Sequence, residues 1–136
     1  MTRRNKMIYW VATSWLALGM ASTGLVQLIK MQEEVEKTSI HLGYPIYFLS
    51  IIGVWKLLGV VAILIPKNAL LKEWAYAGFF FVMSGAIISH LVLKDDTMDF
   101  FGPILLIILI LISWYYRPND RKFASLNHEM NIDYEK

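Results

Sequence analysis

Three polar side chains fall inside long apolar runs of the sequence, where a polar group needs a partner: Gln27, Lys56 and His90. Lys56 lies almost at the centre of its run, where a charged lysine costs roughly 2.5–3.5 kcal/mol on membrane-insertion scales. An ammonium and an imidazole can hydrogen-bond a ligand carbonyl and supply protons to it. We therefore take Lys56 and His90 as the first candidates for ligand binding or proton transfer.

The elements that must position these residues are four apolar runs, at about residues 7–29, 46–65, 73–93 and 100–116. A helix rises 1.5 Å per residue, so about 20 apolar residues cross the roughly 30 Å hydrocarbon layer of a bilayer. The sequence predicts an all-α, four-helix transmembrane bundle with up-down-up-down topology. Residues 1–118 would form this domain, and residues 119–136 a polar cytoplasmic tail.

The composition supports a lipid environment and excludes several kinds of chemistry. Hydrophobic residues make up 57% of the 136 residues and charged residues 18%. The chain has no cysteine, which excludes disulfides, thiolate nucleophiles and cysteine-ligated metals. The basic residues are scattered around the runs, so nucleic acid is not an expected partner. The first run is longer than a signal-peptide core, which indicates a retained span.

The positive charges predict the orientation of the bundle. Nine lysine and arginine residues fall in the two termini and the break between the second and third runs, whereas the other two breaks hold three. Lys56 is left out of this count because it lies inside a run. Cytoplasmic segments carry the excess of positive charge, so both termini are expected in the cytoplasm.

With this orientation the polar residues converge at one depth. Helical side chains lean toward the N-terminus of their own helix, so Lys56 leans outward while His90 and Gln27 lean inward. Ser89 and Tyr47 lie at or above the same depth. The sequence therefore predicts one polar, ligand-binding pocket that opens toward the outer surface, with the candidate residues Gln27, Tyr47, Lys56, Ser89 and His90.

Each of these residues also has a structural interpretation. Lys56 could extend outward and pair with Glu33, Asp95 or Asp96, and His90 could simply be solvated. Gln27 is typical of a hydrogen bond between helices, and Lys72 and Glu73 are typical of a membrane boundary. Four glycines, Gly53, Gly59, Gly78 and Gly85, are expected to allow close helix packing. A three-histidine metal site is excluded, because His128 falls on the opposite side from His41 and His90. His41 and His90 could both reach a metal or haem at the outer face, but no metal site is expected.

Four segments in register carry a resemblance to a known family. They are His41–Phe48, Gly53–Gly59, Leu71–Gly78 and Gly85–His90. Over about residues 7–118 the chain resembles the DoxX-like family of small bacterial membrane proteins. The matching motif residues are Gly43, Tyr44, Pro45, Lys56, Gly59, Glu73, Trp74, Tyr76, Ser89 and His90.

The resemblance implies a multi-pass protein of the bacterial inner membrane. The family takes its name from a subunit of a thiosulfate:quinone oxidoreductase, and some relatives are proposed to join membrane oxidoreductase assemblies. Most members have no established activity, so the resemblance does not decide whether this chain is an enzyme. Because the chain has no cysteine, a thiol role suggested for parts of the broader family is not expected here.

Two hypotheses of function follow. In the first, the protein is an accessory subunit of a membrane redox or detoxification system, has no intrinsic cofactor, and binds a quinone or similar apolar molecule near Lys56 and His90. In the second, Lys56 and His90 only stabilise the bundle, and the function lies in contacts with membrane oxidoreductase subunits or with a second copy. Quinone binding that depends on Lys56 separates the two.

Overall fold

A computed structural model describes residues 1–122, and residues 123–136, including His128, lie outside the described part. The four long helices are α1 (Arg3–Leu28), α3 (Ile46–Leu64), α4 (Ala69–Leu93) and α5 (Thr97–Tyr115). Each is long and apolar enough to cross a membrane. The prediction of an all-α bundle with four membrane-spanning helices is confirmed.

Short elements complete the described part of the chain. Between α1 and α3 lie α2 (Gln32–Val35) and the π-helical segment η1 (Glu36–His41). A 3-10 turn, η2 (Asn119–Arg121), follows α5. We call the end of the bundle that carries α2, η1 and the α4–α5 turn the outer end, and the opposite end the inner end.

Three helices begin or end a few residues away from the predicted bounds. The chain takes left-handed backbone angles at Lys67 and Asn68, and α4 begins directly after them at Ala69 rather than at residue 73. At the start of α1, the Thr2 hydroxyl accepts a hydrogen bond from the Asn5 amide at 3.2 Å, and the helix begins at Arg3. Helix starts therefore follow turns and caps rather than the first apolar residue.

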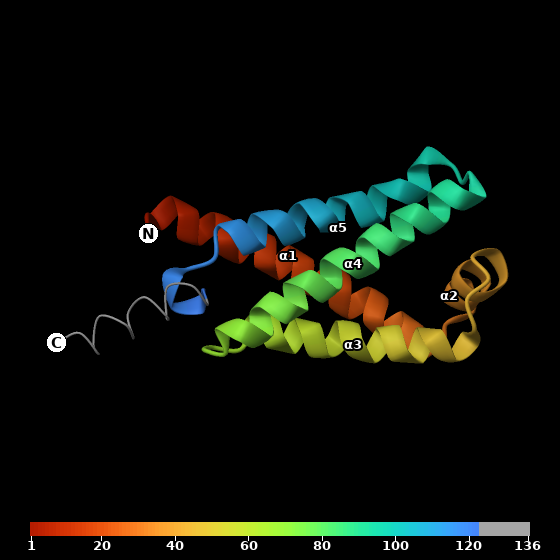
Figure 1. The fold of residues 1–136 in the computed structure, drawn as a ribbon, viewed down its shortest axis with the longest axis horizontal. Coiled ribbons are helices and arrows are strands. Elements are labelled where there is room, and N and C mark those ends of the chain that lie inside the picture. Colours follow the sequence, from red (N-terminus) through yellow and green to blue (C-terminus); the bar gives the residue numbers. More distant parts are fainter. Residues whose placement is uncertain (123–136) are drawn as a thin grey trace.

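The four helices form a bundle in which α1 packs against α3 and α5, and α4 packs against the same two helices. Figure 1 shows α4 lying beside α3 near the turn that joins them and beside α5 at its other end. One cluster of the hydrophobic core contains the large side chains Leu16, Met20, Ile63, Tyr76, Phe79, Met83 and Ile110. Because α4 crosses from α3 to α5, the outer half of the bundle is less tightly filled.

Two glycines bring α1 and α3 into close contact. A Cβ on Gly53 would lie 2.7 Å from the Gly24 carbonyl oxygen, and a Cβ on Gly24 would lie 2.9 Å from Lys56 Cβ. Gly53 thus serves the predicted role in packing. Gly59 serves it too, since a Cβ there would lie 2.5 Å from the Phe79 ring of α4. Gly78 and Gly85 do not, because a Cβ on either would meet nothing within 4 Å.

Lys72 is completely buried, which corrects its interpretation as a boundary residue. Its ammonium donates to the carbonyl oxygens of Ala62 at 2.9 Å and Ile63 at 3.3 Å, and also to that of Ile65. The last carbonyls of a helix have no partner within the helix and carry partial negative charge. Lys72 of α4 therefore caps the C-terminus of α3 and stabilises the inner turn.

Glu73 also does more than mark a boundary, because it joins α4 to the end of α5. Its carboxylate pairs with Arg117 and accepts a hydrogen bond from Trp114 Nε1 at 2.8 Å. The Arg117 guanidinium lies 5.3 Å from the centre of the Tyr76 ring. The inner end is thus held by a network of charged and aromatic side chains.

We expect Lys72→Met to destabilise the bundle by about 2 kcal/mol, because it leaves buried carbonyl groups without a donor. The measurement is the unfolding midpoint in detergent. Lys67→Met, at an exposed lysine in the same turn, is the control and should have little effect. An unchanged midpoint for Lys72→Met would contradict the capping role.

A buried trio of hydroxyl groups joins three helices. Ser113 of α5 lies 2.6 Å from the Thr13 hydroxyl of α1 and 2.7 Å from the Tyr76 hydroxyl of α4. We expect Ser113→Ala to lower the free energy of unfolding by about 1 kcal/mol, the usual scale for a hydrogen bond between membrane helices. Ser22→Ala is the control, since Ser22 is exposed and its hydroxyl donates to the Gly19 carbonyl of its own helix.

Candidate functional site

The outer half of the bundle contains a cavity of about 500 Å³, which we call the outer cavity. Its walls come from the four long helices and the α2–η1 segment, and they are mainly apolar. The polar residues that line it are Thr23, Gln27, Glu34, Lys37, Thr38, Tyr44, Lys56, Ser89 and His90. A cavity of this size, with apolar walls and a few polar groups, is typical of a small-molecule site.

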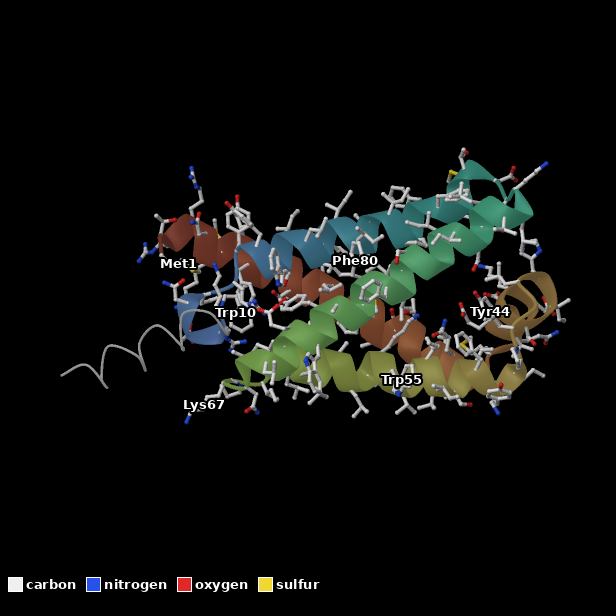
Figure 2. The ribbon with its side chains drawn as sticks, viewed as in Figure 1. Met1, Trp10, Tyr44, Trp55, Lys67 and Phe80 are labelled. Atoms are coloured by element: carbon white, nitrogen blue, oxygen red, sulfur yellow. The ribbon has the colours of Figure 1, made fainter. Side chains whose placement is uncertain are left out.

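Four of the five predicted site residues lie in this one cavity: Gln27, Lys56, Ser89 and His90. Tyr47 does not, since its side chain is 66% exposed on the outside of α3. Tyr44 lines the cavity instead, three residues earlier and just before the helix begins. Figure 2 shows Tyr44 at the outer end of the bundle, beside the segment that carries α2.

Lys56 lies on α3 at the bottom of the cavity and is only 4% exposed. Its ammonium donates a hydrogen bond to the Thr23 hydroxyl at 3.3 Å, and that hydroxyl donates to the Gly19 carbonyl at 2.9 Å. Within residues 1–122 the ion pairs are His41–Asp95, His90–Asp95 and Arg117–Glu73, so Lys56 has no direct carboxylate partner there. The alternative interpretation, in which Lys56 pairs with Glu33, Asp95 or Asp96, is therefore not supported.

The close packing of α1 and α3 explains the position of Lys56. Gly24 has no side chain, so the Lys56 Cβ can lie directly against the α1 backbone. This contact directs the rest of the side chain along α1 toward Thr23, one residue before Gly24. An ammonium carries three donors, and Thr23 accounts for one of them among the described residues. The others can serve a ligand or water.

Gln27 presents a hydrogen-bond acceptor without a partner. Its amide nitrogen donates to the Glu34 carboxylate of the short helix α2 at 3.3 Å, which is a hydrogen bond between helices as expected. A carboxylate only accepts, so this contact fixes which end of the amide is the nitrogen. The amide oxygen is buried and unpaired in the described part of the chain. A ligand hydroxyl or a water would satisfy it.

His90 is fixed by the turn that follows α4. Lys94 takes a left-handed conformation and ends the helix, and the Asp95 amide donates back to the His90 carbonyl at 3.1 Å. This turn places the Asp95 carboxylate 2.7 Å from His90 Nδ1 and 2.7 Å from His41 Nε2 of η1. In a neutral His90 ring, Nδ1 then carries the proton and Nε2 is an acceptor.

The two histidines change the acidity of Asp95. Hydrogen bonds from His90 and His41 hold the pKa of Asp95 below its ordinary value, because they favour the charged carboxylate. The same carboxylate connects η1 to α4 and so joins two walls of the cavity. His90 is therefore not simply solvated, and His41 has a role at the outer end that the sequence did not indicate.

Ser89 and Tyr44 form a second connection across the cavity. The Ser89 hydroxyl donates to the Gly85 carbonyl at 2.9 Å, so the Tyr44 hydroxyl is the donor in the 2.9 Å contact between Tyr44 and Ser89. The Tyr44 ring stacks on Phe48 at 4.9 Å between ring centres. In residues 1–122 no group of three or more metal-ligating side chains is arranged to hold a metal.

The comparisons with known proteins give one family match. The model of the DoxX-like family matches residues 11–113. This span includes all of α3 and α4, most of α1 and α5, and every residue of the outer cavity. No curated protein and no solved structure gives a significant match. The chain therefore belongs to the DoxX-like family.

Proposed function

We propose that this membrane protein binds a quinone-like apolar molecule in the outer cavity and serves a membrane redox or detoxification partner. The observation that carries the proposal is the meeting of Lys56, Gln27 and His90 in one mainly apolar cavity of about 500 Å³. The proposed setting is the bacterial inner membrane, with both termini in the cytoplasm. Its partners there would be subunits of a membrane oxidoreductase.

The polar groups of the cavity fit the functional groups of such a ligand. Lys56 can donate to a carbonyl oxygen, and the unpaired Gln27 oxygen can accept from a hydroxyl. His90 can hold or release a proton, with Asp95 fixing the orientation of its ring. A bound quinone would supply the redox chemistry, whereas the chain supplies binding, orientation and proton exchange.

A structural role is the second candidate, and the His90–Asp95–His41 contacts favour it. These contacts satisfy Asp95 without any ligand and join η1 to α4. In this alternative, Lys56 and His90 only hold the bundle together, and the function lies in contacts with another membrane protein or a second copy. Such a protein would lose stability, but no ligand, when Lys56 is replaced.

We expect Lys56→Met to weaken quinone binding by about 10- to 100-fold, the loss of one hydrogen bond from a charged donor. The measurement is titration of the purified protein with a decyl-substituted benzoquinone, together with the unfolding midpoint. Lys94→Met, at an exposed lysine beyond the cavity, is the matched control and should bind like wild type. Equal binding by wild type and a folded Lys56→Met protein would exclude this site.

The Asp95 connection predicts a pH-dependent stability. The pKa of Asp95 is lower in the folded protein than in the unfolded chain. Asp95 therefore stabilises the fold above the ordinary carboxyl pKa of about 4, and this stabilisation is lost as the pH falls through the lower pKa of the folded state. We expect Asp95→Asn to unfold at a lower temperature than wild type at neutral pH, with a difference that shrinks toward pH 3. Asp96→Asn, at an exposed neighbouring carboxylate, is the control, and its difference in unfolding temperature from wild type should not depend on pH in this way.

A further inference from the structure

A second hollow lies on the outside of the bundle between α3 and α4, and we call it the α3–α4 groove. Its volume is about 370 Å³, and apart from Lys56 its lining is apolar. Trp55, Leu58 and Trp74 line it and are each more than 60% exposed on the bundle surface. On a helix that spans a membrane such exposure means contact with lipid, so the groove opens sideways into the bilayer.

The groove and the outer cavity adjoin at Lys56. Three residues line both hollows: Ile52 and Lys56 of α3, and Val82 of α4. From this junction the groove continues toward the inner end, past Gly78 to Leu71 and Trp74. Figure 2 shows Trp55 midway along α3, with Tyr44 at the outer end and Lys67 at the opposite end. The outer cavity, with its few polar groups, and the apolar groove thus lie against the same three residues of α3 and α4.

Two glycines shape the groove in different ways. A Cβ on Gly59 would lie 2.5 Å from the Phe79 ring, so this ring packs directly against α3 at Gly59 and lines the groove there. A Cβ on Gly78 would meet nothing within 4 Å. Gly78 therefore keeps the groove open without being needed for helix packing, which distinguishes it from Gly24 and Gly53.

We infer that the α3–α4 groove binds the long apolar tail of the ligand whose polar head lies in the outer cavity. The inference rests on the proposed function and adds the class of ligand: a molecule with a hydrogen-bonding head and an alkyl or isoprenoid tail. The chemistry matches at both ends, since the head meets Lys56 and Gln27 and the tail, beyond Lys56, meets apolar side chains. Lateral opening lets such a molecule enter from the lipid.

The test compares two probes, a tailless substituted benzoquinone and its decyl counterpart, on the purified full-length protein. Gly78→Phe fills the groove, and Ala77→Phe adds a ring at the adjacent exposed residue that lines neither hollow. We expect Gly78→Phe to weaken decylquinone binding at least about tenfold, the effect of losing one or two methylene contacts in an apolar site. Tailless quinone should bind unchanged, and Ala77→Phe should resemble wild type with both probes.

Each outcome is decisive. In one outcome, Gly78→Phe binds both probes like wild type while Lys56→Met binds neither. The groove then holds ordinary lipid, so the tail site is overturned, but the proposed function stands. If Lys56→Met binds both probes normally, the proposed function fails and the tail site fails with it. If Gly78→Phe does not fold, a decylquinone with a photoreactive group at the tail end replaces it. Labelling within α3 and α4 residues of the groove then supports the inference, and labelling elsewhere overturns it.

Discussion

The structure depends on how a lysine ammonium is accommodated inside a membrane-spanning helix. Lys56 is almost fully buried, yet within residues 1–122 it has no direct carboxylate partner, and only the Thr23 hydroxyl accepts a hydrogen bond from its ammonium. A buried charge without compensation is costly, so the remaining donors need water or a ligand. The outer cavity provides the space for either. The arrangement of helices and turns in the outer half keeps this cavity open.

Three features keep the cavity open while the bundle remains stable. The contact between Gly24 and Gly53 brings α1 and α3 together, so that Lys56 is directed along α1. The crossing of α4 from α3 to α5 separates the helices at the outer end (Figure 1). The contacts of Asp95 with His41 and His90, and of Tyr44 with Ser89, connect the separated walls. Tight packing at the inner end, with Lys72 as the cap of α3, balances the looser outer half.

Much of this could be predicted from the sequence, because length and apolarity of a run determine whether it spans a membrane. The convergence of Gln27, Lys56, Ser89 and His90 also followed from helix direction and side-chain tilt. Tyr47 was misplaced because the prediction did not fix the rotation of α3 about its axis. Tyr44 precedes that helix and points into the cavity, while Tyr47 faces outward.

The remaining differences involve contacts between distant segments. Lys72 and Glu73 resemble ordinary boundary residues in sequence, and only the fold shows that one caps α3 and the other holds Arg117. Gly24 has no small residue four positions away on its own helix. No small-residue motif in the sequence therefore predicts its close contact with Gly53 of the other helix. Conversely, Gly78 and Gly85 have a spacing typical of packing but face open space.

The most direct test of this account is whether water from the outer side reaches the surroundings of the Lys56 ammonium. Because the chain has no cysteine, Thr23→Cys places a single thiol at the position that now receives the Lys56 hydrogen bond. We expect a small, membrane-impermeant thiol reagent to modify Thr23→Cys from the outer side of sealed vesicles, and to leave Ile63→Cys, in the packed core, unmodified. A Thr23→Cys thiol protected from both sides would show that Lys56 lies in a dry, closed interior, and would contradict the ligand cavity.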